Sequence, residues 1–459
     1  MEREQNFTRG PIFWPLVRFA LPVLLALLLQ TMYGAVDLMI VGRFGGEMAE
    51  VYVSAVATGS QLMHTVTMVI SGLAMGVTIL VARQVGAGEP EEAGNTIGSG
   101  IWLFAGVSAA VTAAVICAAR PLAELMQAPP EALEETVRYV VICASGTTLI
   151  VGYNLLGSIF RGIGDSRLPL VTVAIACVLN ILGDLLLVAV FHMGAAGAAA
   201  ATITAQGMSV LISLWILRHR NLPFRLGRKE LRPKGDRIRE ILGLGIPISL
   251  QNLLVNVSFL VITAIVNALG LTASAGVGVA QKLCGFLMLV PSAFLQSMSA
   301  FAAQNLGAGK PERARRALLC AIAASLAVSV VTFFFTFFRG DLLSGIFAKD
   351  APVVAASAEY LKAYAVDCLL TAFLFCFIGY FNGLGSTKFV MIQGLIGAFG
   401  VRLPVSYLMS LLEPVSLFAI GLATPASTAV QILLCGIWFY VICRQEKRGR
   451  LPGGSLPGT

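Results

Sequence analysis

Long apolar runs separated by short polar connections dominate the chain. A transmembrane helix needs about 20 apolar residues, and these runs lack the period-two alternation that barrel strands show. The runs that reach this length lie at residues 12–41, 51–81, 93–118, 133–158, 167–191, 194–218, 241–268, 274–303, 312–338, 357–381, 388–411 and 416–443. The pattern predicts an all-α integral membrane protein with twelve transmembrane helices, which is a multi-pass protein of the lipid bilayer.

The composition of the 459 residues supports this prediction. Hydrophobic residues make up 57% and charged residues only 12%, whereas soluble domains carry roughly 25% charge. Soluble, disordered and disulfide-stabilised secreted proteins are therefore excluded. The first run is too long for the core of a signal peptide and lacks a small-residue cleavage site, so we expect a retained span. The nine cysteines lie nearly all inside apolar runs and are interpreted as small hydrophobic residues.

Basic residues are distributed unequally between the two sets of connections. Of the 32 Lys and Arg residues, 24 lie at the termini or in even-numbered connections and six in odd-numbered ones. The positive-inside rule then places both termini in the cytoplasm. The net charge of +8 is thus a topology signal with lipid-headgroup contacts, and a nucleic-acid partner is not expected.

The chain contains an internal repeat. Residues 82–90 recur at 303–311 as Gly-Ala-Gly-x-Pro segments, and residues 160–167 recur at 381–388, both with an offset of 221. We therefore predict two six-helix lobes related by a parallel repeat. Their expected bounds are 1–218 for the N-terminal lobe, 219–240 for a basic cytoplasmic linker, 241–443 for the C-terminal lobe and 444–459 for a cytoplasmic tail.

A single-chain, two-lobe repeat favours a transporter that works by alternating access. An enzyme is not expected, because the chain has only three His residues and carries no HExxH, GxSxG or Walker-type motif. No cofactor, resident metal or catalytic residue is predicted.

Five motifs in this order resemble the multidrug and toxic compound extrusion (MATE) family over essentially the whole chain, in particular its DinF-like branch. They are Asp37-Leu-Met-Ile-Val-Gly-Arg-Phe-Gly, the two Gly-Ala-Gly-x-Pro segments, Arg161-Gly-Ile-Gly-Asp-Ser, Asn180-Ile-Leu-Gly-Asp and Gly197-Ala-Ala-Ala-Ala-Thr. The resemblance implies a V-shaped antiporter in the plasma (inner) membrane. It would export amphipathic, often cationic small molecules against inward flow of H⁺ or Na⁺. We expect a monomer.

Acidic residues inside the spans mark the candidate coupling-ion site. Asp184 maps onto Val405 with the offset of 221, and Asp37 maps onto Ile262 when the first spans are matched at Pro22 and Pro247, so the second half lacks both acids. Asn180 and Asp184 share a helix face because they lie four residues apart, and both acids are expected at one depth. Ionisable groups there are costly and persist where they serve a function.

Two neighbouring carboxyl groups out of water cannot both ionise easily, so one becomes a proton acceptor. With Asn180 and Thr202 added, the same cluster offers oxygen ligands for Na⁺. The residues leave both ions open, and we favour the proton. The resemblance to the DinF-like branch rests on these four positions. The acidic residue that the NorM-like branch carries in helix 7 is replaced by Asn256.

Pro22 lies in the middle of the first span, fifteen residues before Asp37. Its missing N–H permits a bend, which is either a hinge that responds to the charge of Asp37 or a static kink. Further polar residues are candidate substrate contacts, most of them by the family resemblance. They are Gln30, Tyr33, Asn154, Gln206 and Asn256.

The second half carries its own charged residues inside the spans, Lys282, Asp367 and Arg402, at nearly one predicted depth. We expect Asp367 to pair with one or both cations. This cluster is either a structural lock or a binding point for anionic groups of a substrate. The alternative function is a flippase for a lipid-linked or anionic headgroup. A membrane scaffold without transport does not account for the paired carboxylates.

Overall fold

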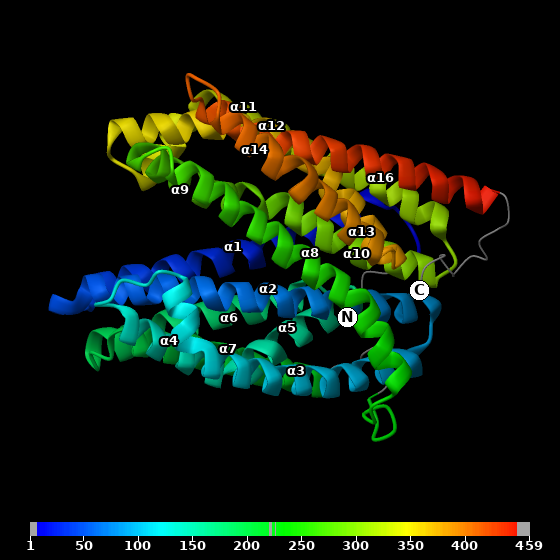
Figure 1. Cartoon of the computed structure of the whole chain (residues 1–459). Coiled ribbons are helices and arrows are strands. Elements are labelled where there is room, and N and C mark those ends of the chain that lie inside the picture. Colours follow the sequence, from blue (N-terminus) through cyan, green and yellow to red (C-terminus); the bar gives the residue numbers. More distant parts are fainter. Residues whose placement is uncertain (1–6, 220–222, 225, 448–459) are drawn as a thin grey trace. The chain divides into compact units, whose positions relative to one another are not determined.

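The computed structural model describes residues 7–219, 223–224 and 226–447. Every regular element among these residues is helical (Figure 1). The first part of the chain forms α1 (Phe13–Phe44), a short 3₁₀ turn η1 (Gly46–Met48), α2 (Ala49–Ala87), α3 (Pro90–Leu125), α4 (Leu133–Ser145), α5 (Thr147–Gly162), α6 (Arg167–Asp184), the π-helical η2 (Leu185–Val190) and α7 (Gly194–His219).

The second part contains α8 (Gly235–Asn267), α9 (Leu271–Leu287), α10 (Leu289–Gly307), α11 (Pro311–Phe347), α12 (Ala351–Leu384), α13 (Thr387–Leu395), the π-helical η3 (Ile396–Arg402), α14 (Leu403–Ser410), α15 (Leu417–Gly421) and α16 (Ala423–Lys447). Among the described residues, eleven helices, some of them made of consecutive shorter helices, are long and apolar enough to cross a membrane. The pair α4 and α5, bent by 54°, forms the twelfth span. The predicted twelve-helix fold is confirmed.

Two compact units divide the chain at positions that differ from the predicted lobe boundaries. The first-half unit is Leu25–Gly245, and the second-half unit combines Met1–Leu24 with Ile246–Thr459. Helices α1 and α8 therefore each begin in one unit and end in the other. Pro22 and Pro247 both lie within three residues of these division points.

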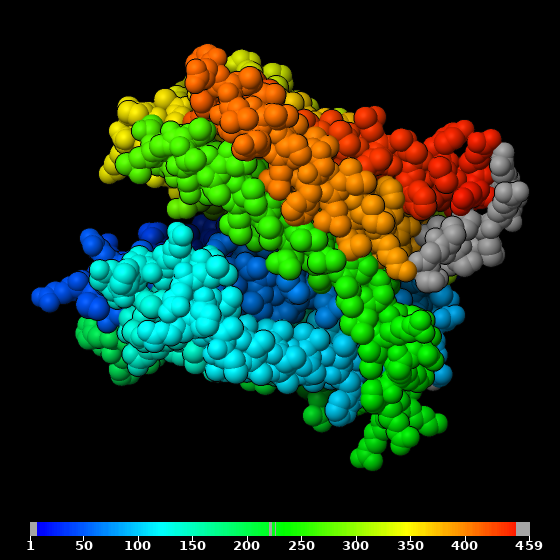
Figure 2. All heavy atoms as spheres, in the orientation of Figure 1, coloured from blue at the N-terminus to red at the C-terminus, as the bar shows by residue number. Residues whose placement is uncertain are grey.

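Close helix packing in the first-half unit depends on small residues. A Cβ atom added at Gly76 of α2 would lie 2.7 Å from the carbonyl oxygen of Ile241, and one at Gly245 would lie 2.6 Å from that of Leu73. The backbones of α2 and of the first turns of α8 thus touch, as small residues permit in membrane helices. Helices α3 and α4 cover one face of this unit, seen in cyan in Figure 2.

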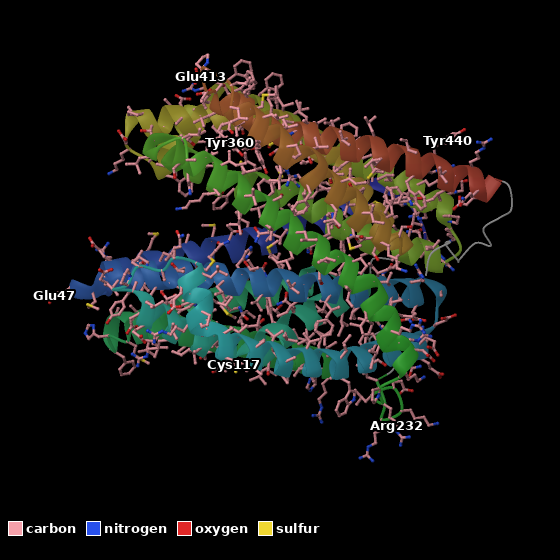
Figure 3. The ribbon with its side chains drawn as sticks, in the orientation of Figure 1. Glu47, Cys117, Arg232, Tyr360, Glu413 and Tyr440 are labelled. Carbon is pink, nitrogen blue, oxygen red and sulfur yellow. The ribbon has the colours of Figure 1, made fainter. Side chains whose placement is uncertain are left out.

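The second-half unit has an apolar core of its own. Residues of α8, α9 and α12 meet there, including the fully buried Ala280, Tyr360 and Leu361, and Figure 3 shows Tyr360 among these helices. Gly379 and Gly383 of α12 again allow close backbone contact, because a Cβ atom there would lie 2.5 and 2.6 Å from carbonyl oxygens of α10.

The contact at Gly76 predicts an unusual response to alanine. Gly76→Ala should destabilise the protein, because overpacking typically costs about 1–3 kcal/mol. Gly278→Ala is the matched control: its added Cβ meets nothing within 4 Å, so only the better helix propensity of Ala acts, by about 1 kcal/mol. Thermal unfolding midpoints in detergent should fall for the first variant and hold or rise for the second. Equal midpoints would contradict the close packing.

Candidate functional site

Three helices of the first-half unit bring together four polar residues. Asp37 comes from α1, Asn180 and Asp184 from α6, and Thr202 from α7. The side chains of Asp37, Asn180 and Asp184 are only 4%, 2% and 0% exposed. Apolar residues of α1 and α6 that flank them pack into the surrounding hydrophobic core. We call these four residues the acidic cluster.

Thr202 connects the members of the acidic cluster. Its hydroxyl lies 3.5 Å from Oδ2 of Asp37 and 3.0 Å from the carbonyl oxygen of Ala198, so its single proton can serve either acceptor. The amide Nδ2 of Asn180 donates to the same hydroxyl at 3.4 Å. The carboxyl groups of Asp37 and Asp184 lie within hydrogen-bonding range of each other.

The sequence of α6 and α7 explains this proximity. A Cβ atom at Gly183 would lie 3.0 Å from that of Ala201, so the two helices approach closely beside Asp184 and Thr202. Gly197, in the Ala-rich start of α7, lies equally close to the backbone of η2 at Leu187. The change from α-helix to π-helix directly after Asp184 is typical of functional sites.

Several acceptor oxygens in the acidic cluster have no donor among the described residues. They are Oδ1 of Asp37, Oδ1 of Asn180 and both carboxyl oxygens of Asp184. Buried polar atoms are normally satisfied, and an uncompensated buried charge is costly. One proton on either acid would supply a donor to the other carboxyl group. A cation held by the same oxygens would serve the same purpose.

A small pocket adjoins the acidic cluster and contains several of the predicted substrate contacts. It offers about 10 Å³, room for roughly one water molecule. It is lined by Asn180 and Thr202 together with Tyr33, Tyr153, Val173, Ala176, Ala205 and Gln206. Tyr33 and Gln206 lie beside each other in this lining. Gln30 donates to the Tyr153 hydroxyl at 2.8 Å. Asn180 and Thr202 thus belong to both the pocket and the acidic cluster.

Tyr153 was missing from the sequence-based candidates, which named its neighbour Asn154 instead. The side chain of Asn154 accepts from Ser71 at 2.7 Å and donates to the carbonyl oxygen of Ile150 at 2.8 Å, and it does not line the pocket. Asn256 lies on α8 in the second-half unit, whereas the other four candidates belong to the first-half unit. The sequence did contain a signal for Tyr153: it is a tyrosine in an apolar span, and its hydroxyl needs a hydrogen-bond partner when buried.

The chain is similar to known proteins over both of its halves. The family model MatE matches residues 22–186 and again 247–408, so the two matches begin at Pro22 and Pro247. The chain belongs to the MATE family. Its members are transporters, and the repeated match confirms the two-lobe repeat predicted from the sequence.

Relatives and solved structures cover nearly the full length of this MATE chain. The probable multidrug resistance protein YpnP of Bacillus subtilis (strain 168) is 29% identical over 406 residues, which are 88% of this chain and 90% of YpnP. Two solved structures share the fold. "MATE in the bent conformation" has a TM-score of 0.91 and 20% identity, and "MATE in the straight conformation" has a TM-score of 0.90 and 19% identity. Each match spans 98% of this chain and 100% of the solved chain.

Pro22 lies inside α1 of the MATE chain, and α1 continues through it as one helix. Because proline has no N–H, the carbonyl of Arg18 loses its i→i+4 partner at this point. The helix is therefore weaker here than elsewhere along its length, and Asp37 follows about 22 Å further along the same helix at 1.5 Å per residue.

The second-half unit of the MATE chain contains a buried pair of opposite charges. Asp367 of α12 is 2% exposed and Arg402, the last residue of η3, is 6% exposed. Arg402 donates from Nη1 to the Ser258 hydroxyl at 3.1 Å, and its guanidinium lies 4.4 Å from the ring centroid of Phe259. Asp367 lies beside Thr428 and close enough to Arg402 for their charges to attract.

Lys282 does not join this pair, contrary to the expectation of a three-residue cluster. Its side chain is exposed. The buried face of α9 is formed by Val277, Ala280 and Cys284, spaced by three and four residues. Lys282 lies two positions from Ala280 and Cys284, and residues two apart on a helix face opposite directions. Equal depth along the spans therefore did not imply contact.

The buried pair gives a test by double substitution in the MATE protein. Arg402→Met should lower the thermal unfolding midpoint strongly, since removing one partner of a buried pair costs about 3–5 kcal/mol. Adding Asp367→Asn to Arg402→Met should restore most of the loss, because no uncompensated charge remains. If the unfolding midpoint of the double variant falls by the sum of the drops caused by the two single substitutions, Asp367 and Arg402 do not act as a pair.

Proposed function

We propose that this MATE protein exports amphipathic, often cationic compounds by alternating access, driven by protons that enter through the acidic cluster. The observation that carries the proposal is the set of buried acceptor oxygens of Asp37, Asn180 and Asp184 for which the described residues provide no donor. The repeat strengthens it, since Ile262 and Val405 occupy the equivalent positions. A role in packing alone would be served as well by apolar residues.

The shared lining of cluster and pocket supports a direct mechanism of exchange. With both acids ionised, the pocket lies beside negative charge and favours a cationic substrate. A proton taken up by Asp37 or Asp184 removes part of that charge and gives the two carboxyl groups a hydrogen bond. Proton and cationic substrate therefore compete for one site. One proton moving down 100 mV supplies about 2.3 kcal/mol, enough for a concentration gradient of roughly 50-fold.

We propose that the protein lies in the plasma membrane as a monomer. Both of its termini would then lie in the cytoplasm. The excess of Lys and Arg in the even-numbered connections supports this topology. Export of multiple drugs is in keeping with the similarity to YpnP, which is named a probable multidrug resistance protein.

Substitution of either acid tests the coupling. Asp37→Asn and Asp184→Asn should each abolish export driven by a proton gradient in proteoliposomes, because neither residue can then exchange a proton. Substrate binding to the purified protein should remain measurable. Asp341→Asn, an exposed aspartate on α11, is the matched control and should transport at the normal rate.

The same vesicles decide the ion. A proton gradient alone should drive export, and a sodium gradient alone should not. Export driven by a sodium gradient alone would instead identify Na⁺ as the ion that the acidic cluster couples to transport. Normal accumulation by well-inserted Asp37→Asn or Asp184→Asn protein under both gradients would reject the coupling site itself.

Pro22 is proposed as a hinge of α1. Pro22→Ala restores the helical hydrogen bond to Arg18 and should stiffen this region. We expect turnover to fall while substrate affinity stays within about twofold, because a bend that changes between states affects rates. Parallel measurement of the maximal transport rate and of substrate binding separates an effect on turnover from an effect on affinity. Unchanged turnover with weakened binding would make Pro22 a packing element.

A further inference from the structure

The segment that precedes α1 is fastened to the start of α11 in the second-half unit. We call residues 7–12 the first leading segment. Arg313 of α11 donates from all three guanidinium nitrogens, at 2.7–3.2 Å, to the backbone carbonyls of Phe7, Arg9, Gly10 and Pro11. Lys310 donates to the carbonyl of Thr8 at 2.9 Å, and Asn305 to that of Phe7 at 3.2 Å.

An aromatic contact completes this attachment. The side chain of Phe7 is fully buried. Its ring centroid lies 5.1 Å from that of Phe19 in α1 and 5.0 Å from that of Phe301 in α10. The first turns of α1 are thereby held against helices of the second half of the sequence.

The segment that precedes α8 is fastened to α3 in the first-half unit. We call residues 226–234 the second leading segment; in Figure 3 its Arg232 projects away from the helices. Trp102 of α3 donates to the carbonyl of Leu231 at 2.9 Å, and the N–H of Lys234 donates to the Ser99 hydroxyl at 3.1 Å. Gly98 leaves room for this backbone, since a Cβ atom there would overlap the carbonyl of Glu230.

An ion pair fixes the first turn of α8 beside the second leading segment. Arg237 donates from Nη2 to Glu92 of α3 at 2.5 Å and from Nη1 to Glu240 at 2.6 Å. Glu92 and Arg237 are both partly shielded from solvent. The guanidinium of Arg237 thus links α8 to α3 by a charge-assisted hydrogen bond, which is among the stronger kinds.

The two attachments are related by the internal repeat. The offset of 221 that relates the repeated motifs also relates Pro90 to Pro311 at the first position of α3 and α11, and Glu92 to Arg313 two residues later. The same position in each half therefore holds the segment that leads into the other half. Arg313 does so by binding carbonyls, and Glu92 by binding Arg237.

We propose that Arg313 and the Glu92–Arg237 pair are positioning residues for transport, two repeat-related clamps that hold the first turns of α1 and α8. This inference rests on the proposed function. Because the clamped turns belong to one unit and the rest of each helix to the other, a rearrangement between transport states has to be absorbed beyond the clamps. Pro22 and Pro247 lie in those stretches. Without a clamp, the leading turns move freely and the helix no longer transmits the change.

The clamp at Arg313 is tested first without transport. Hydrogen–deuterium exchange of the peptide that contains residues 7–12 and the first turns of α1 should be at least about tenfold faster in Arg313→Ala. The N–H groups of these turns, such as that of Leu16, which donates to the carbonyl of Ile12, lose protection when the charge-assisted bonds that hold the segment are removed. Arg313→Lys should show an intermediate increase, because a lysine cannot serve several carbonyls at once. Arg316→Ala, an exposed arginine on the same helix, is the matched control. Unchanged exchange in Arg313→Ala would overturn the clamp.

Charge exchange tests the second clamp during transport. Glu92→Arg and Arg237→Glu should each lower the maximal export rate by roughly 2- to 150-fold, the range that corresponds to coupling energies between contacting residues, with little change in KM. The double variant should recover most of the rate, because the pair is rebuilt in reverse. Arg239→Glu, an exposed neighbour, is the control for charge alone.

The outcomes separate this inference from the proposed function. If the double variant does no better than the single ones, or if KM rises while the maximal rate holds, the clamps do not position the helices for transport. If Asp37→Asn retains normal gradient-driven export, the proposed function fails, while the exchange result for residues 7–12 stands unaffected.

Discussion

The absence of water inside a bilayer governs every polar group of this protein. Each buried donor or acceptor needs a partner within the chain, because exposure to hydrocarbon costs several kcal/mol. The two units meet this constraint differently. In the second-half unit a cation, Arg402, stands near the buried Asp367. In the first-half unit two acids face each other, and several of their oxygens find no donor among the described residues. Oδ1 of Asp367 and Nε of Arg402 also lack a hydrogen-bond partner among the described residues, but a cation of the chain itself offsets the charge of Asp367. The two facing acids of the first-half unit call instead for an exchangeable ion.

This difference gives the repeat a division of labour. Both halves have the same order of six spans. A π-helical segment ends the fifth span of the first half and interrupts the fifth span of the second half. In the first half that segment directly follows Asp184 of the acidic cluster, and a pocket adjoins this cluster. In the second half the corresponding segment ends at Arg402, which stands near Asp367. This difference is the basis for proposing that ion coupling belongs to the first half.

Much of the fold could be predicted from the sequence, because span length and hydropathy are local properties. The spacing of four between Asn180 and Asp184 also placed both on the face that meets Asp37, although their coupling role stays a proposal. Lys282 was misplaced because depth was considered without helix face. Tyr153 was missed because one polar residue was chosen over its neighbour. The bond between Arg313 and Phe7 joins residues 306 apart, and no local pattern could indicate it.

That separation has a consequence for the order in which the chain is made. Phe7 leaves the ribosome long before Phe301 and Arg313 exist. At about 5–20 residues per second, the intervening chain takes roughly 15–60 s to synthesise. The first-half unit, which ends at Gly245, is complete before then. The N-terminal segment must therefore wait outside its final contacts while most of the protein inserts, and its docking is among the last steps of assembly.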